Sequence, residues 1–89
     1  MATVSWSRRA IASLNEEMAW IAQSNPLAAQ RLSEQLREAV DRLDQFPNRG
    51  RRGQISDTRE IVVREYIIIY RVRSSQVIVA RVIHGRRRR

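Results

Sequence analysis

The stretch TREIVVREYIIIYRVRSSQVIVARVIH, residues 58–84, decides the fold of this 89-residue chain. It holds three runs rich in β-branched and aromatic residues, TREIVV, YIIIYRV and QVIVARVIH, which are typical of β-strands. The runs are joined near Arg64-Glu65 and Ser74-Ser75, and such short connections favour antiparallel neighbours. We therefore predict a meander of three antiparallel strands. The strand ends at Arg64-Glu65 stay open, because no Asn-Gly or glycine signal fixes a turn there.

The segment before this stretch predicts one short strand and two helices. Residues 2–6, ATVSW, alternate in polarity like a strand of about four residues. Ser7 is a suitable cap for a helix over roughly residues 7–23, whose apolar residues recur with a 3.6-residue period. Asn25 as N-cap and Pro26 in the first turn then favour a second amphipathic helix.

The two predicted helices form a hairpin that needs an apolar surface to cover. Phe46 and Pro47 are expected to close the second helix. A tight link between two amphipathic helices makes them a hairpin with a shared apolar face, and the sheet is the surface available. We predict an α+β fold of order β-α-α-β-β-β, an antiparallel helical hairpin packed on an antiparallel sheet. A chain this short supports one core, so residues 1–89 are predicted to form a single domain with residues 86–89 as a free basic tail.

Arginine dominates the charge of the chain. The formal net charge is +8, and all 17 basic residues are arginines, against nine acids. Seven arginines lie in two segments, NRGRRG at 48–53 and HGRRRR at 84–89, while the other ten nearly balance the acids. A guanidinium is a planar fork of donors that suits phosphate and carboxylate. The clustering favours an anionic partner over a merely solubilising surface, and residues 48–56 are predicted to be a mobile basic loop.

The composition also excludes several classes of function. With no cysteine, the chain has no disulfide, thiol chemistry or thiolate zinc site, and a single histidine argues against a transition-metal site. No apolar run approaches the ~18 residues of a membrane span, and the start MATVSWSRRAIASLNEE is too polar for a secretory signal. We expect a soluble cytoplasmic protein without a membrane partner, metal or cofactor.

The last strand places its polar residues by alternation. In a regular strand, successive side chains lie on opposite faces, so Arg81 and His84 do not share a site. A bulge near the strand end, or departure of the chain at Gly85, would bring them together. The predicted faces are Val77, Val79, Arg81 and Ile83 on one side and Ile78, Ala80, Val82 and His84 on the other.

The other strands also carry arginines among apolar residues. Arg59 and Arg71 are predicted to lie at sheet edges or to pair with Glu60 and Glu65. Arg81 has apolar neighbours on both sides in the sequence, so it must leave the core or find a partner.

Four segments, in their order along the chain, resemble the RelE/ParE superfamily of bacterial toxins from type II toxin–antitoxin modules. They are SWSRRAIASLNEEMAWIAQSNPLAAQRL, FPNRGRRG, DTREIVVREYIIIYRV and VARVIHGRRR, and they cover nearly the whole chain. The resemblance implies a helical hairpin on an antiparallel sheet, and a cognate, ParD-like antitoxin that wraps the toxin and silences it. One departure is Asp57, where ParE-like sequences tend to have glycine. The conformation entering the second strand therefore stays open.

The resemblance implies two possible targets. RelE-like members cut mRNA in the decoding site of the ribosome, whereas ParE-like members poison DNA gyrase. Cleavage requires a proton acceptor, stabilisation of phosphorane charge and a donor to the leaving oxygen. RelE-like toxins supply these groups with lysines, arginines and a tyrosine or histidine–tyrosine pair, but this chain has no lysine, and arginine stays protonated. The favoured hypothesis is a ParE-like gyrase poison without catalytic residues. A nucleic-acid-binding module without toxicity is the third hypothesis.

Candidate site residues follow from these hypotheses. A RelE-like endonuclease acting on ribosome and mRNA is expected to use Arg59, Arg81 and His84 for catalysis. Trp20, beside the apolar stripe of the first helix, is the candidate anchor for the antitoxin, with packing against the second helix as the alternative. The hydroxyls of the strand tyrosines are expected to point at water. The residues predicted to bind the target or nucleic acid are Arg49, Arg51, Arg52, Arg81, His84, Arg86 and Arg87.

Overall fold

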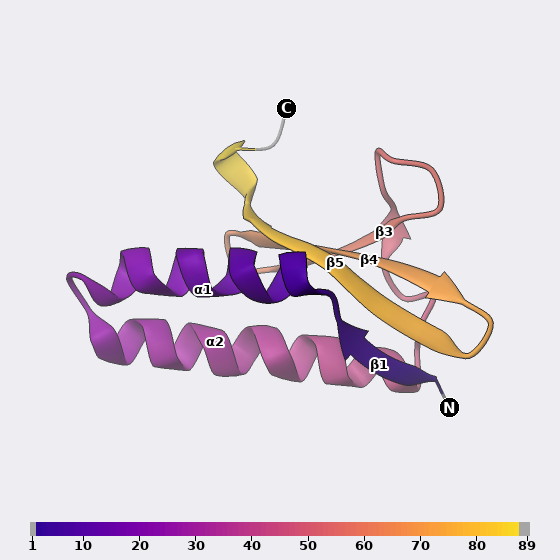
Figure 1. Cartoon of the computed structure of the whole chain (residues 1–89), viewed down its shortest axis with the longest axis horizontal. Coiled ribbons are helices and arrows are strands. Elements are labelled where there is room, and N and C mark those ends of the chain that lie inside the picture. Colours follow the sequence, from indigo (N-terminus) through magenta and orange to yellow (C-terminus); the bar gives the residue numbers. More distant parts are fainter. Residues whose placement is uncertain (1, 88–89) are drawn as a thin grey trace.

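A computed structural model describes residues 2–87 and contains one five-stranded sheet of order β1-β5-β4-β3-β2 (Figure 1). The predicted antiparallel meander is confirmed, because β4 pairs antiparallel with both β3 and β5. The N-terminal strand joins the sheet parallel to β5, with Thr3 opposite Gln76 and Trp6 opposite Val79. The strands are β1 (Thr3–Trp6), β2 (Arg51–Arg52), β3 (Arg59–Val63), β4 (Tyr66–Arg73) and β5 (Gln76–His84).

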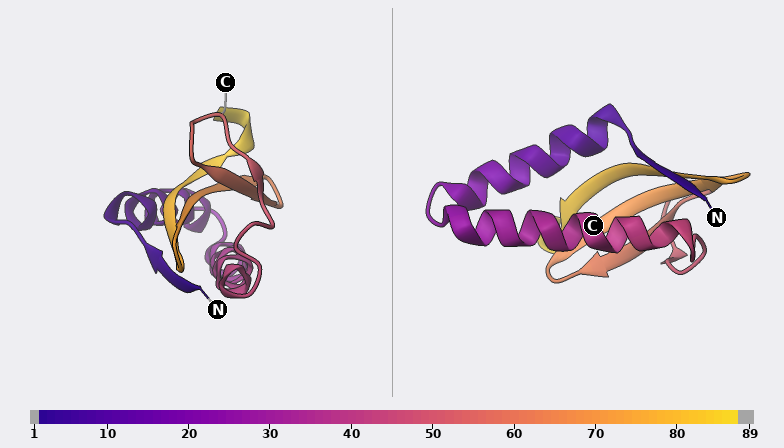
Figure 2. Two further views of the ribbon diagram at one scale, coloured as in Figure 1. Left: turned by 90° about the vertical axis from the view of Figure 1, so that its right-hand side faces the viewer. Right: turned by 90° about the horizontal axis from the view of Figure 1, so that it is seen from below.

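Both predicted helix starts are confirmed. The side chain of Ser7 accepts a hydrogen bond of 3.0 Å from the backbone N–H of Ala10, which caps α1 (Arg8–Ala22). Asn25 caps α2 (Pro26–Asp41) in the same way, and Pro26 occupies its first turn. The two helices lie antiparallel on one face of the sheet (Figures 1 and 2).

The second helix ends earlier than predicted. Its α-helical part ends at Asp41, and the tighter 3₁₀ turn η1 (Arg42–Asp44) follows in place of a helix that reaches Phe46. The tightened turn places Leu43 in the core, where it is fully buried beside Tyr70 and Val77. Neither helix is long and apolar enough to cross a membrane within the described residues.

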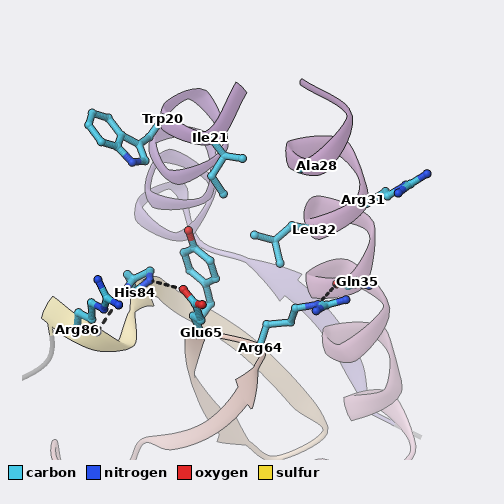
Figure 3. Close-up of a pocket in the computed structure, with 11 residues that line it drawn as sticks. Trp20, Ile21, Ala28, Arg31, Leu32, Gln35, Arg64, Glu65, His84 and Arg86 are labelled. Carbon is cyan, nitrogen blue, oxygen red and sulfur yellow. Dashed lines mark hydrogen bonds and ion pairs between the residues drawn. The ribbon is translucent and has the colours of Figure 1, made fainter. Parts of the chain in front are cut away.

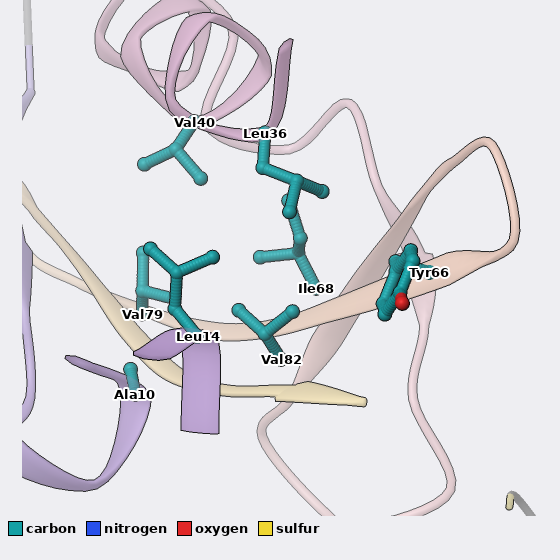
Figure 4. Packing of buried hydrophobic residues seen from close by; sticks show 8 residues of the cluster. All are labelled: Ala10, Leu14, Leu36, Val40, Tyr66, Ile68, Val79 and Val82. Atoms are coloured by element: carbon teal, nitrogen blue, oxygen red, sulfur yellow. The ribbon is translucent and has the colours of Figure 1, made fainter. Parts of the chain in front are cut away.

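The main core lies between the hairpin and the sheet (Figure 4). Helices α1 and α2 contribute residues at their predicted 3.6-residue spacing, and β4 and β5 contribute every second residue except at one irregularity. Each fully buried leucine of this kind stabilises the fold by roughly 1.5–3 kcal/mol. The cluster consists of Ala10, Leu14, Leu36, Val40, Tyr66, Ile68, Val79 and Val82.

The irregularity is a β-bulge at Ala80. Ile69 lies opposite Arg81 while the next residue, Tyr70, lies opposite Val79, so Ala80 is an extra residue in β5. The bulge reverses the alternation, and Val82 enters the same core cluster as Val79. The predicted faces of β5 are therefore wrong beyond Ala80. Arg81 and His84 still lie on opposite faces, because the bulge precedes both of them.

The connection at Arg64-Glu65, which the sequence left open, and the one at Ser74-Ser75 are both two-residue turns. Val63 pairs with Tyr66 across Arg64-Glu65, and Arg73 pairs with Gln76 across the serine pair. The first residue of each turn has a positive φ, 55° at Arg64 and 54° at Ser74. Tight antiparallel turns require this conformation, which glycine usually supplies.

The basic segment after η1 is pinned to the sheet, contrary to the prediction of a mobile loop. Arg51 and Arg52 form β2 and pair with Glu60 and Arg59 of β3. The residues just before β2 are held as well. The hydroxyl of Tyr70 accepts a hydrogen bond of 2.9 Å from the N–H of Gly50 and donates one of 2.8 Å to the carbonyl of Pro47. The sequence predicted that this hydroxyl faces water. Tyr70 is instead fully buried.

Asp57 lies in the bend that enters β3 and has a φ of 64°. This left-handed conformation is the one that glycine adopts without steric cost, and aspartate is among the few other residues that tolerate it. The departure from the family pattern at this position is thus compatible with the same backbone.

Helix α1 completes the edge of β5 beyond the end of β1. The parallel pairing of β1 stops at Val79, and past that point the side chain of Ser13 accepts a hydrogen bond of 3.0 Å from the N–H of Val82. The Ser13 hydroxyl also donates to the carbonyl of Ala10 at 3.0 Å. A helix side chain therefore substitutes for the missing strand next to the bulge.

We expect Ser13→Ala to lower the free energy of unfolding by about 1–2 kcal/mol. Val82 is buried, and the substitution removes the hydroxyl that accepts the hydrogen bond from its backbone N–H. Urea titration of the purified variant measures this change. Ala12→Ser, one position away on the exposed side of α1, is the matched control and should be nearly neutral. Equal stability of wild type and Ser13→Ala would contradict this role.

Candidate functional site: a groove and an arginine-rich sheet face

A groove of about 690 Å³ lies at the end of the hairpin where the two helices meet (Figure 3). The last turns of α1 and the first turns of α2 form two walls, and the β3–β4 turn with the end of β5 forms the third. Its apolar lining consists of Trp20, Ile21, Ala28, Leu32 and Tyr66.

Arginines surround this apolar lining. Arg31 comes from α2, Arg64 from the β3–β4 turn and Arg86 from the segment after β5, and Glu65 is the acid among them. Arg64 is held in place by a hydrogen bond of 3.0 Å from its Nε to the side-chain oxygen of Gln35. An apolar floor with a mainly cationic rim suits a partner that is both apolar and acidic.

Trp20 is the most exposed large apolar side chain on the walls of this groove. The exposed fraction of Trp20 is 68%, so the indole does not pack into the core edge against α2. In Figure 3 it lies at the outer side of the groove, on α1. Exposed indoles of this kind are enriched at protein–protein contacts.

His84 closes one side of the groove and has both ring nitrogens engaged. Its Nδ1 accepts a hydrogen bond of 3.1 Å from the backbone N–H of Arg86, so in the neutral ring the proton lies on Nε2. Nε2 is 3.0 Å from a carboxylate oxygen of Glu65. The ring also meets the Tyr66 ring edge to face at a centroid distance of 5.1 Å. His84 therefore fixes the start of the C-terminal segment.

The sequence predicted a free tail that starts at residue 86, but the structure shows a turn there. Gly85–Arg87 form a 3₁₀ turn, η2, and the N–H of Gly85 donates to the carbonyl of Glu65 at 2.7 Å. The other arginines of the predicted tail, at 88–89, lie outside the described residues.

The sheet face opposite the helices carries further arginines. Residues paired across strands share a face, so Arg51, Glu60, Ile69 and Arg81 form one row on this side. Glu60 is buried and holds Arg51 through an ion pair of 3.2 Å. The β2–β3 connection and the C-terminal segment both rise on this side of the sheet (Figures 1 and 2). The two basic segments of the sequence thus border one surface.

The three residues that a RelE-like mechanism would need are not brought together. Arg59 lies opposite Tyr70 and His84 opposite Tyr66, which separates them by about 13 Å along β4 at roughly 3.3 Å per residue. Arg81 lies on the other face of the sheet from both. The described geometry gives these side chains no common centre.

The ion-pair partners predicted for the strand arginines are wrong. Nη1 of Arg59 donates to the carbonyl of Gly50 at 2.8 Å and to that of Asn48 at 3.3 Å, so this arginine anchors the basic segment. Glu60 pairs with Arg51, and Glu65 pairs with His84.

Sequence reasoning missed Arg31 and Arg64 of the groove and the role of Tyr70. Arg31 lies off the apolar stripe of α2, as the periodicity indicates, but the other two arginines of the groove, Arg64 and Arg86, lie more than 30 positions away in the sequence. The signal for Tyr70 was faint. A tyrosine facing the core must find a hydrogen-bond partner for its hydroxyl, and the turn around Pro47 and Gly50 offers two backbone groups.

The class of protein follows from these features. A helical hairpin on one face of a sheet is the fold that the resemblance to RelE/ParE toxins implies. The family model described as the ParE toxin of the type II toxin–antitoxin system, parDE, matches residues 4–89. The chain belongs to this family and is a toxin of a type II toxin–antitoxin system.

Relatives that are named as toxins agree with this assignment. Toxin RelE2 of Caulobacter vibrioides is 39% identical over 87 residues, covering 98% of this chain and 99% of the relative. The putative toxin Y4kP of Sinorhizobium fredii is 39% identical over 84 residues, covering 92% and 86%. The relatives thus include a toxin named RelE, although the family model is that of ParE.

The fold is shared with two solved toxin–antitoxin structures. The chromosomal ParDE system from P. aeruginosa matches with a TM-score of 0.86 at 21% identity, covering 94% of this chain and 96% of the other. The RelBE2 complex from Mycobacterium tuberculosis matches with a TM-score of 0.71 at 22% identity, covering 93% and 96%. At these identities the similarity concerns the fold and leaves the target of the toxin open.

Proposed function

We propose that this toxin acts by binding, as a ParE-like inhibitor of DNA gyrase, and is neutralised by a cognate ParD-like antitoxin. The observation that carries the proposal is the state of His84. Both of its ring nitrogens are engaged, by Glu65 and by the N–H of Arg86, and Arg59 and Arg81 lie elsewhere. General acid–base cleavage of RNA needs a free proton acceptor within hydrogen-bonding reach of the reacting hydroxyl. The geometry supports binding without such a group.

The surface proposed for the target is the sheet face opposite the helices. Arg81 lies on its floor, Arg51 lies at its β2 edge, and Arg49 precedes Arg51 in the sequence, whereas Arg52 pairs with Arg59 and lies on the other face. His84 contributes by positioning Arg86 and the turn of Gly85–Arg87, and Arg87 belongs to that turn. Guanidinium groups on a sheet suit the phosphates of a gyrase–DNA complex and the carboxylates of the gyrase protein.

The groove at the end of the hairpin is the proposed antitoxin site. Its apolar floor and three arginines match an apolar, acidic segment docked between helices and sheet, with Trp20 as the anchor. Such a segment would contact Arg86 and the side chains that hold it, so antitoxin binding and target binding meet at the C-terminal end of β5.

A RelE-like, ribosome-dependent mRNA endonuclease is the second candidate. The observation that favours it is the 39% identity to a relative named RelE2. This function would require His84 to leave Glu65 and Arg86 and approach Arg59 and Arg81 when mRNA is bound.

Purified toxin incubated with gyrase, ATP and supercoiled plasmid is expected to accumulate linear DNA, which gel electrophoresis detects. Arg81→Gln is expected to raise the toxin concentration needed by about ten-fold, because one charge-assisted contact is lost. Arg8→Gln, which removes the same charge from the exposed start of α1, is the matched control.

Unchanged plasmid at micromolar toxin would contradict gyrase poisoning. The second candidate is tested on programmed ribosomes, where it predicts new 5′ ends in the decoding site that His84→Ala abolishes. Growth arrest on induction, rescued by the neighbouring gene, separates both candidates from a binding module without toxicity.

A further inference from the structure

A second hollow, of about 800 Å³, lies at the opposite end of β3 and β4 from the antitoxin groove. The groove meets these strands at the Arg64-Glu65 turn, whereas this hollow meets them at Arg59 and Arg73. The β2–β3 connection forms its other side. Its lining is mainly polar, unlike that of the groove, so its ligand differs in chemistry from an apolar helix.

Three arginines and one acid line this hollow, and two of the arginines have no partner. Arg59 is immobilised by its hydrogen bonds to the carbonyls of Asn48 and Gly50. The side chains of Arg52 and Arg73 are exposed and make no hydrogen bond or ion pair within residues 2–87. Asp57 is the acid. Guanidinium forks around one polar space suit an oxyanion, and a phosphate diester above all.

An exposed aromatic ring lines a hollow that adjoins the one with the three arginines. Asn48 lines both this hollow and a smaller one that contains Phe46, so the two spaces adjoin. The exposed fraction of Phe46 is 61%, and η1 and Pro47 fix its backbone against the core. A ring in solvent beside a phosphate-binding space matches the way single strands are held, by base stacking and backbone charge together.

We propose that this surface binds single-stranded nucleic acid, with a phosphate between Arg52 and Arg73 and the adjoining base stacked on Phe46. A duplex covers its base faces by stacking, so an exposed ring favours an unpaired strand. An acidic protein is the alternative partner of the arginines, and competition with polyglutamate tests it. The proposal goes beyond the inhibition of gyrase and does not depend on it, because it concerns free strands and other residues.

Binding is tested with purified toxin and a short fluorescent oligodeoxythymidylate, by anisotropy over a series of salt concentrations. The double variant Arg52→Gln/Arg73→Gln is expected to bind about ten-fold or more weakly. The slope of log affinity against log salt should fall by about 0.7 for each phosphate contact removed. Both side chains are exposed and unpartnered, so the variant should keep its fold, which circular dichroism checks.

Phe46→Ala is expected to lose about five-fold or more in affinity with an unchanged salt slope, because it removes stacking and no charge. Arg31→Gln is the matched control, since it removes a positive charge from the antitoxin groove at the other end of the molecule. It should leave oligonucleotide binding within about two-fold of wild type, because a single distant charge is screened by salt.

Equal affinities of wild type and the double variant would overturn the proposal. So would tighter binding to duplex DNA of the same composition than to the single strand, or displacement of the oligonucleotide by polyglutamate at equal charge. None of these measurements contains gyrase or a ribosome, so failure here leaves the proposed function standing.

Discussion

Tyr70→Phe is expected to lower the free energy of unfolding by about 2–4 kcal/mol, since two backbone groups lose their partner. The hydroxyl of Tyr70 accepts from Gly50 N–H at 2.9 Å and donates to Pro47 C=O at 2.8 Å. Tyr70 and Gly50 are both buried, so water does not replace the lost bond at the N–H. Urea unfolding followed by tryptophan fluorescence measures the loss.

A substitution at Gly50, which donates one of these hydrogen bonds, provides the control. A Cβ atom on Gly50 would lie 2.6 Å from the Tyr70 hydroxyl and 2.7 Å from the carbonyl oxygen of Glu60. Gly50→Ala is therefore expected to destabilise the fold as well, and the two changes together should cost less than their sum. Strict additivity, or a Tyr70→Phe variant as stable as wild type, would contradict this role of the Tyr70 hydroxyl.

The pH dependence of the free energy of unfolding reports on the Tyr70 hydroxyl separately. Burial raises the pKa of Tyr70 above its ordinary value, against opposing effects of the Gly50 hydrogen bond and of Arg59 and Arg49. The folded state thus holds this proton more tightly than the unfolded state, so the stabilisation is present below about pH 10 and is lost as the pH rises above that. Tyr70→Phe should remove this part of the decline.

Ala28→Glu is expected to weaken binding of the cognate antitoxin by about 100-fold or more. Ala28 lines the groove, and glutamate adds both volume and a negative charge where an acidic, apolar segment is proposed to dock. The change should not harm the helix. Residue 28 lies three positions after the cap Asn25, where glutamate completes a favourable N-terminal pair and meets the positive end of the helix. Isothermal titration with the antitoxin measures the affinity.

Two further variants separate charge from volume and position. Ala28→Gln has the same size without the charge and should retain part of the affinity. Trp20→Ala should weaken antitoxin binding by about ten-fold or more if the indole is an anchor. Ile11→Ala removes another exposed apolar side chain of α1 outside the groove and should have no effect. Wild-type affinity of both Ala28→Glu and Trp20→Ala would place the antitoxin elsewhere.

Local signals account for the parts of the fold that the sequence predicts well. The caps at Ser7 and Asn25 act on their own helix within three residues, so they are readable without knowledge of the rest of the chain. The same holds for the three β-rich runs, whose alternation survives in β3 and β4.

The bulge at Ala80 depends on distant partners instead. It lies where β1 stops and Ser13 begins to supply the hydrogen bond of β5, which is a relation across 69 positions. No residue in QVIVARVIH indicates the bulge, because a bulge of this kind does not require glycine. The two residues of β2 were hidden for the same reason, since their strand character comes from pairing with Arg59 and Glu60.

The candidate site was predictable in its charge but not in its geometry. Counting arginines located the two basic segments, and the exposed position of Trp20 beside the α1 stripe pointed to a contact surface. The groove itself combines α1, α2, the β3–β4 turn and the segment after β5. Only the tertiary arrangement shows that His84 contacts Glu65 and Arg86 rather than the arginines of the opposite sheet face.

The parallel contact between the first and fifth strands has a consequence for biosynthesis. Thr3 finds its neighbour Gln76 only after almost the entire polypeptide has left the ribosome, and α1 rests on that same late strand. The nascent chain therefore remains without a closed interior until translation of the fifth strand. We therefore expect a toxin built in this order to become active only after its fifth strand has been synthesised.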